Sequence, residues 1–172
     1  MLCCSPFQIF SKNSMLRRTL RQLSSSSRSP IRGTLAMREN VSDVEVGDYI
    51  EMVRGFDRED VRSFGELIGD ENPIHDAQDG IVQGHLCSSL FSALLGTKFP
   101  GCLYMSQNVK YRRSVHINEL IKARVTVRRV MSRGNKILLK CDTTCKLQAT
   151  NETNDKSIVV DGHALVSVIS NN

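Results

Sequence analysis

The sequence predicts an α+β domain in which an antiparallel sheet curls around one buried helix. Two observations lead to this prediction. Residues 84–97 are apolar around most of a helix circumference, and a helix of that kind must be buried. Residues 103–169 hold four segments, rich in Val and Ile, that alternate with the two-residue period of strands. Several strands after one buried helix favour a sheet wrapped around it.

The first part of the domain is expected to contain one strand and one surface helix. Residues 44–53 alternate weakly and predict an entry strand. A helix is expected to start after Asp57, whose carboxylate can accept hydrogen bonds from the first N–H groups, and to stop at Gly69. Its apolar side chains fall on one face at helical spacing: Val61, Phe64, Leu67 and Ile68.

The buried helix is expected from Gly84 to Thr97, ended by Pro100 and Gly101. The strands are expected at Leu103–Tyr111, Leu120–Met131, Lys136–Leu147 and Ser157–Ile169. A single sheet of this kind leaves its edge strands open. Pairing two sheets edge to edge would cover them, so we expect a homodimer.

Residues 1–38 differ in composition from the rest of the chain. They hold seven basic side chains and no acidic ones, and Met15–Leu23 can form a short amphipathic helix before a run of serines. This composition is typical of a mitochondrial or plastid transit peptide. We therefore expect a leader at 1–38, cleaved between Ser24 and Arg38, a domain at 39–172, and a location in the mitochondrial matrix. The alternative is a disordered basic tail.

Charge and hydropathy exclude two classes of function. The net charge of +5 comes from the leader, because the remainder carries 16 basic and 18 acidic side chains. With 5% aromatic residues there is no basic face interleaved with aromatics, so we expect no nucleic-acid binding. No apolar run approaches the roughly 20 residues that span a membrane, so we expect no membrane insertion.

Charge is also divided within the domain. Residues 39–79 are acidic, with 13 acidic side chains against three basic, and residues 80–172 are basic, with 13 against five. The basic part could attract an acidic carrier protein or the phosphates of a carrier, with Arg112 and Arg113 as candidates. The alternative is that the two parts neutralise each other in the fold.

The domain cysteines lack the spacing of a disulfide framework or of a zinc site. They are Cys87, Cys102, Cys141 and Cys145. The last two are four residues apart in a predicted strand and therefore share a face. We expect buried thiols in a reducing compartment and no metal site.

The residues that could carry chemistry lie in the loop between the two predicted helices. Asp70 follows the Gly69 helix stop, and His75 comes five residues later. Histidine exchanges protons near neutral pH, and a carboxylate can hold the same water or orient the ring. The N–H groups at Gly84, where the buried helix starts, can face a developing oxyanion. An Asp and a His in a polar loop are otherwise most often a surface turn.

These groups match what the addition of water to an α,β-unsaturated thioester needs. The reaction requires a base for water, an acid for C2 and a donor for the thioester oxygen, and no metal or redox cofactor. Phe64–His75 (FGELIGDENPIH) resembles the signature of the MaoC-like (R)-specific enoyl-thioester hydratases. Five shorter blocks also resemble this family: Ile81–Gly84, Ser89–Ser92, Pro100-Gly101, Ser106-Gln107 and Asp161-Gly162.

The resemblance covers residues 44–169 and is closest to the mitochondrial 3-hydroxyacyl-thioester dehydratases of type II fatty acid synthesis. It implies the hotdog fold and a dimer. It implies that Asp70 and His75 are the catalytic pair, that Gly84 supplies the oxyanion N–H, and that Asn72 and Ser92 support positioning. The implied substrates are (R)-3-hydroxyacyl and trans-2-enoyl thioesters of acyl carrier protein or CoA.

The chain departs from the family pattern between His75 and the buried helix. Only residues 76–83 intervene where the family has a longer segment, and Gln83 stands where the family favours a His, with His85 after the glycine. These departures keep a second hypothesis open, a catalytically silent hotdog module that binds acyl carriers or a protein partner. A hotdog thioesterase is disfavoured because residues 84–97 contain no Asp or Glu.

Overall fold

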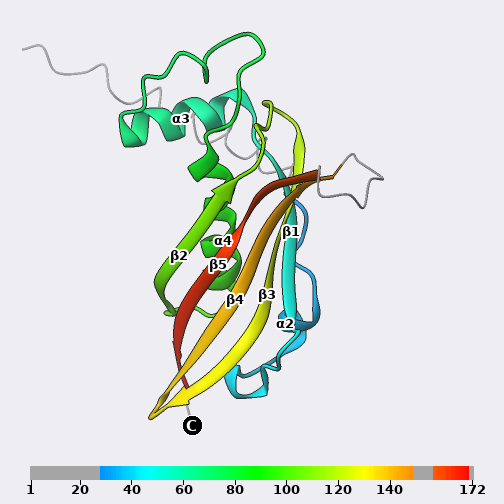
Figure 1. The fold of residues 1–172 in the computed structure, drawn as a ribbon, viewed down its shortest axis with the longest axis vertical. Helices are drawn as coiled ribbons and strands as arrows, with labels where there is room; N and C mark the ends of the chain where they lie inside the picture. The colour runs from blue at the N-terminus through cyan, green and yellow to red at the C-terminus, as the bar shows by residue number, and fades with distance from the viewer. Residues whose placement is uncertain (1–27, 149–156, 171–172) are drawn as a thin grey trace, which may run out of the picture.

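A curved five-stranded antiparallel sheet partly encloses one long helix (Figure 1). The computed structural model describes residues 28–148 and 157–170. Helix α4 (Gly84–Lys98) lies against the inner face of the sheet, and helix α3 (Arg58–Ile68) lies beyond one end of it. The strands follow the order β1-β3-β4-β5-β2, with the bounds β1 Tyr49–Gly55, β2 Leu103–Tyr111, β3 Leu120–Arg133, β4 Lys136–Leu147 and β5 Ile158–Ile169. The predicted α+β fold is confirmed.

The observed elements follow the sequence pattern closely. Strands β2 and β4 have the predicted bounds, and β3 runs two residues further, to a tight turn where Gly134 has φ 61°. Strand β1 starts at Tyr49, not at residue 44, because Gly47 (φ 96°) places a turn before it. The amphipathic segment predicted at Met15–Leu23 lies outside the described residues.

Helix α3 begins and ends where its capping residues predict. The Asp57 carboxylate accepts from the N–H of Asp60 at 2.9 Å, and the Asp60 carboxylate accepts from the N–H of Asp57 at 3.3 Å. This reciprocal capping box supplies acceptors for free donors at both residues. Gly69 stops the helix in the left-handed conformation, with φ 73°, which glycine adopts without strain. The chain therefore turns sharply just before Asp70.

The core lies between α4 and the inner face of the sheet. Phe91, Leu94 and Leu95 of α4 are fully buried, and so are Cys141 and Cys145 of β4, as predicted. Burial raises the pKa of Cys141 to about 12. Its thiol therefore stays protonated at neutral pH and takes part in packing, not in chemistry.

Helix α4 is not buried on every side of the single chain. Its outward side consists of small or polar residues that are exposed: His85, Ser89, Ser92, Ala93, Gly96 and Thr97. The sequence, apolar around most of the helix circumference, predicted a buried helix, and the outer side of α4 differs from that prediction. None of the described helices is long and apolar enough to cross a membrane.

Residues 29–38, expected to belong to the leader, pack on the domain. Arg32 and Glu51 exchange two backbone hydrogen bonds, of 3.0 and 2.8 Å, and the N–H of Ser29 donates to the Val53 carbonyl at 2.9 Å. This segment therefore covers the free edge of β1. Leu35, on the short helix α2 (Thr34–Met37), is fully buried in the core.

An ion pair fastens the end of this segment. The Arg38 guanidinium donates to the Asp48 carboxylate at 2.8 and 3.2 Å. Burial raises the pKa of the Asp48 carboxyl, but hydrogen bonds from Arg38, from the N–H of Glu45 and from Thr34 outweigh it, so the pKa lies below its ordinary value. A carboxyl with a lowered pKa in the folded state stabilises the fold above its unfolded pKa, and that contribution is lost as the pH falls through the lowered value.

We expect Leu35→Ala to lower the free energy of unfolding by about 2–5 kcal/mol, because it removes a fully buried leucine. Met37 is on the same helix but is 83% exposed, so Met37→Ala should change the free energy by no more than about 0.5 kcal/mol. Chemical denaturation of the full chain measures both. Equal effects of the two substitutions would show that the segment does not belong to the folded domain.

Candidate active site

The end of α3 sets the position of Asp70. The N–H of Asp70 donates to the Gly65 carbonyl at 2.9 Å, which holds the residue directly after the Gly69 stop. The Asp70 Oδ1 atom accepts from the N–H of Asn72 at 3.1 Å, and the Asn72 side chain accepts from the N–H of Ile74 at 3.3 Å. The two side chains thus fold the loop back on itself through local turns, which Asp and Asn favour.

His75 is half-buried and faces Asp70. Its Nδ1 lies 2.7 Å from the Ile81 carbonyl, which can only accept, so Nδ1 carries the proton in the neutral ring. Nε2 then has a free lone pair, and it lies 3.4 Å from Oδ2 of Asp70. The structure therefore brings together the two predicted residues and fixes the tautomer that leaves the nitrogen facing the carboxylate as a base.

The start of α4 lies close to this pair, because Ile81, which holds the His75 ring, is three residues before Gly84. The first N–H groups of a helix have no acceptor within the helix and point outward with the positive end of its dipole. The need for glycine at 84 has a clear cause. A Cβ there would lie 2.8 Å from the ring of Tyr111, at the end of β2. The Tyr111 hydroxyl lies 3.4 Å from Ser88 Oγ on the same helix.

Gln83 joins the start of α4 to α3. Its side chain is buried, and its Nε2 donates to the Val61 carbonyl at 3.0 Å. The same nitrogen lies 3.4 Å from where a Cβ on Gly65 would stand. Gln83 therefore lies next to the end of α3 that carries Asp70, and its side-chain amide links α3 to the start of α4.

We expect Gly84→Ala to lower kcat by about tenfold or more, because the new methyl group must displace either the Tyr111 ring or the first turn of α4, where the oxyanion N–H is predicted. Gly96 on the same helix has open space around its Cα, so Gly96→Ala is the matched control and should leave kcat unchanged. Steady-state hydration kinetics compares them. Adding Tyr111→Ala should restore part of the lost activity, and an inactive double variant would argue against the steric explanation.

A hollow of about 560 Å³ opens beside Gly84. Its lining is mainly apolar and includes Ile81, Val82, Val115, Val159 and Val160. Arg112 and Arg113 also line it, and the Arg112 guanidinium pairs with Asp161 at 2.5 Å. The Cys87 thiol on the same lining is not a nucleophile at neutral pH, since burial raises its pKa to about 12.

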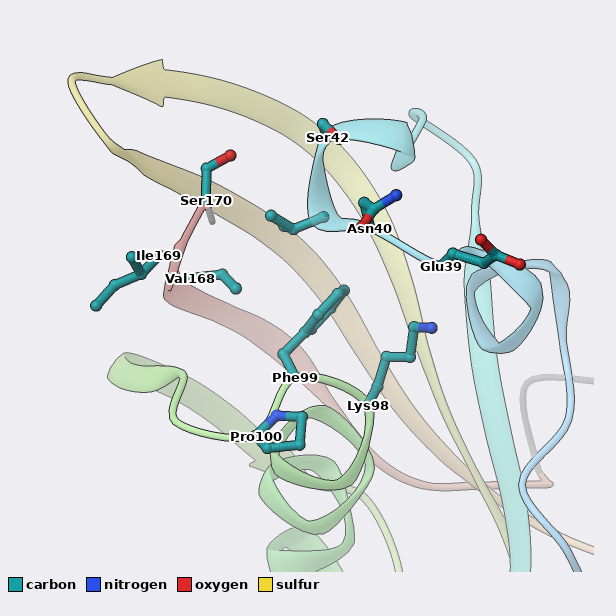
Figure 2. A pocket seen from close by; sticks show the side chains of 10 residues that line it. Glu39, Asn40, Ser42, Lys98, Phe99, Pro100, Val168, Ile169 and Ser170 are labelled. Atoms are coloured by element: carbon teal, nitrogen blue, oxygen red, sulfur yellow. The ribbon is translucent and has the colours of Figure 1, made fainter. Parts of the chain in front are cut away.

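A second hollow, of about 370 Å³, lies at the opposite end of α4 (Figure 2). There the side chains of Lys98 and Phe99 point toward the segment that carries Glu39 and Asn40. It is about 20 Å along the helix from Gly84, and it contains none of the predicted site residues. We therefore place the candidate site at the Gly84 end.

Of the two residues predicted to support positioning, one lies in the loop of Asp70 and His75 and the other does not. The Asn72 side chain belongs to the loop of the pair and supports its turn, whereas Ser92 is exposed about 12 Å further along α4 and donates to the Ser89 carbonyl at 2.9 Å. His85 is exposed beside Tyr111, with 5.7 Å between the ring centroids. Among the described residues no cluster of His, Cys, Asp and Glu could hold a metal ion.

The sequence interpretation missed two contacts of the site. The Tyr111 ring against Gly84 and the contact of Arg58 with the carbonyls of residues 76–78 both join segments far apart in the chain. A glycine at a helix start was the one sequence signal for the first contact. A basic residue in the first turn of α3 was the signal for the second.

Comparison with known proteins identifies relatives that match most of the chain. The chain is 31% identical to the mitochondrial 3-hydroxyacyl-[acyl-carrier-protein] dehydratase FERN of Solanum lycopersicum, over 70% of this chain and 75% of that protein. It is 31% identical to 3-hydroxybutyryl-CoA dehydratase of Methylorubrum extorquens, over 73% and 82% of the two chains. No protein-family model matches the chain.

A solved structure agrees with these relatives. The (R)-hydratase of Aeromonas caviae involved in PHA biosynthesis superposes with a TM-score of 0.64 and 26% identity, over 74% of this chain and 99% of that one. Fold, motif and relatives therefore agree. The chain belongs to the MaoC-like family of (R)-specific enoyl-thioester hydratases and 3-hydroxyacyl-thioester dehydratases, which are hydro-lyases with the hotdog fold.

Proposed function

We propose that this protein reversibly adds water to trans-2-enoyl thioesters to form (R)-3-hydroxyacyl thioesters, with Asp70 and His75 as the catalytic pair. The observation that carries the proposal is the 3.4 Å approach of His75 Nε2 to the Asp70 carboxylate, with Nδ1 held by the Ile81 carbonyl. The relatives named above act on hydroxyacyl thioesters of acyl carrier protein and of CoA, which supports the same reaction here.

The chemistry follows from these groups. A water that contacts both side chains gives a proton to His75 Nε2 as its oxygen attacks C3 of the enoyl thioester. The Asp70 carboxylate stabilises the imidazolium that forms, because opposite charges within about 4 Å favour the charged state. The thioester oxygen gains negative charge and accepts from the N–H groups at Gly84. The imidazolium then returns its proton to C2, so that one water has been added.

Either carrier of the acyl group fits this proposal. Acyl carrier protein is acidic at its docking surface and CoA carries phosphates, and both would meet the basic residues Arg112 and Arg113 beside the Gly84 hollow. We propose that the reaction takes place in the mitochondrial matrix, as part of type II fatty acid synthesis. A plant relative that is named as mitochondrial supports the mitochondrial location. We propose that the transit peptide ends before Ser29, since residues 29–38 pack on the domain.

We also propose a homodimer that forms along β2. Within the described chain β2 pairs only with β5, so its outer edge is open (Figure 1). Two of its apolar side chains, Leu103 and Met105, are 65% and 51% exposed. Joining two β2 edges would cover both features.

The proposed function is tested with the purified full chain. When the protein is mixed with enoyl-CoA or with the enoyl carrier protein, the absorbance of the enoyl thioester should fall. With the (R)-3-hydroxyacyl thioester as substrate, the same absorbance should rise as the reverse reaction proceeds. The silent-module hypothesis predicts instead that acyl-CoA binds without turnover. Binding without turnover at any chain length, on either carrier, would overturn the proposed function.

A further inference from the structure

The loop that carries His75 has almost no apolar attachment to the rest of the protein. Among residues 71–79, His75 alone is half-buried, and the others are exposed. Burial of apolar surface is the main source of tertiary stability. The position of His75 therefore depends on the polar contacts that its loop makes, both within itself and with neighbouring elements.

A short helical turn forms around His75 and then ends. The N–H of His75 donates to the Asn72 carbonyl, and the N–H groups of Asp76 and Ala77 both donate to the Pro73 carbonyl, each at 3.2 Å. The turn does not continue as a helix. The N–H of Gly80 supplies one donor to the Ala77 carbonyl at 2.9 Å. The carbonyls of residues 76 and 78 need donors from elsewhere, as the last carbonyls of any helical turn do.

Arg58 supplies these donors. Its Nη1 donates to the Asp76 carbonyl at 3.1 Å, and its Nη2 donates to the carbonyls of Ala77 and Gln78, each at 3.1 Å. The planar guanidinium offers donors in a fixed fork, so it can hold three acceptors at once where a lysine ammonium cannot keep the same geometry. A positive charge also compensates the negative end of the turn.

Arg58 stands where a cation is otherwise unfavourable. It is the first residue of α3, and a positive charge there opposes the positive end of the helix dipole. The hydrogen bonds from Arg58 to the loop explain why an arginine is found at this position. The same helix ends at Gly69, directly before Asp70. One rigid helix thus holds Asp70 through its C-terminal end and the turn of His75 through its N-terminal end.

We propose that Arg58 is a positioning residue of the catalytic pair. Its guanidinium binds the carbonyls of residues 76–78 and thereby fixes the short loop that holds His75 against Asp70. This role rests on the proposed function. The short segment 76–83 then has a structural role, because its tight turn presents the carbonyls that the guanidinium binds.

Arg58→Ala tests the proposal, and Arg62→Ala on the same helix is the matched control, since Arg62 is exposed. We expect Arg58→Ala to lower kcat by about tenfold while KM changes less than twofold, because a small displacement of a catalytic group reduces the rate without removing substrate contacts. Arg58→Lys should keep an intermediate kcat. Millimolar guanidinium should restore part of the kcat of Arg58→Ala but none of that of His75→Ala.

A second measurement does not depend on turnover. Hydrogen exchange of the peptide that covers residues 71–82 should be about tenfold faster in Arg58→Ala than in wild type and unchanged in Arg62→Ala. Unchanged exchange overturns the positioning role, whether or not the protein is active. The positioning role is also overturned if Arg58→Ala lowers kcat/KM mainly by raising KM. It is overturned as well if the loss of kcat accompanies a lower melting temperature. An inactive wild type with faster exchange in Arg58→Ala would reject the proposed function and leave the loop contact established.

Discussion

His75→Ala is expected to lower kcat for enoyl-thioester hydration by about a thousandfold. General acid–base catalysis by a positioned histidine contributes rate factors of about 10² to 10⁴. Here the ring is oriented by the Ile81 carbonyl, so that Nε2 faces the carboxylate at 3.4 Å. Without the ring the loop keeps only carboxylates as bases, and a carboxylate is a weaker base than an imidazole. Stopped assays over long incubation measure the residual rate.

Two other histidines provide controls for this substitution. His163 pairs with Asp142 and is mostly exposed, so His163→Ala should leave kcat unchanged. His85, beside Tyr111 in the Gly84 hollow, is a candidate to replace His75 as the base. If His85→Ala abolished turnover and His75→Ala did not, the base would be His85 and the assignment of the pair would be wrong.

Asp70→Asn is expected to lower kcat by about a hundredfold, with little change in KM. The asparagine side chain keeps an oxygen that can accept from the N–H of Asn72, so the local turn survives. What disappears is the negative charge beside Nε2, which stabilises the imidazolium as the water loses its proton. The substitution thus separates charge from loop geometry, and steady-state kinetics at matched protein stability measures it.

The neighbouring carboxylate is the control. Glu71 is exposed in the same loop, so Glu71→Gln removes the same charge one residue away and should leave kcat within about twofold of wild type, as exposed charges are screened by solvent. Equal losses in Asp70→Asn and Glu71→Gln would mean that the loop acts through its overall charge, and the Asp70 carboxylate would have no specific role.

Most of the fold follows from local pattern. Strand alternation, the Asp57 cap and the Gly69 stop all depend on neighbouring residues, and the structure has each of them. Segment 29–38 is harder to predict, because it forms only an isolated bridge to β1, contains Pro30 and lies in a basic, acid-free stretch. Its pairing with Glu51 and Val53 is non-local and leaves no periodic signal.

The candidate site was predictable in part for the same reason. Asp70, His75 and Gly84 stand at boundaries of elements, where motif and helix ends can be recognised in sequence. The groups that hold them in place cannot be recognised in this way. Arg58 acts across about 20 residues on backbone carbonyls, which carry no residue identity. Tyr111 reaches Gly84 only because β2 returns alongside α4.

Chiral analysis of the product tests the central claim most directly. The full chain is incubated with crotonyl-CoA, and the 3-hydroxybutyryl product is separated into its (R) and (S) forms. We predict the (R) form alone from wild type and almost no product from His75→Ala under the same conditions. Formation of the (S) form, or equal amounts of (R) product from both proteins, would contradict the assignment of Asp70 and His75 as the pair that adds water.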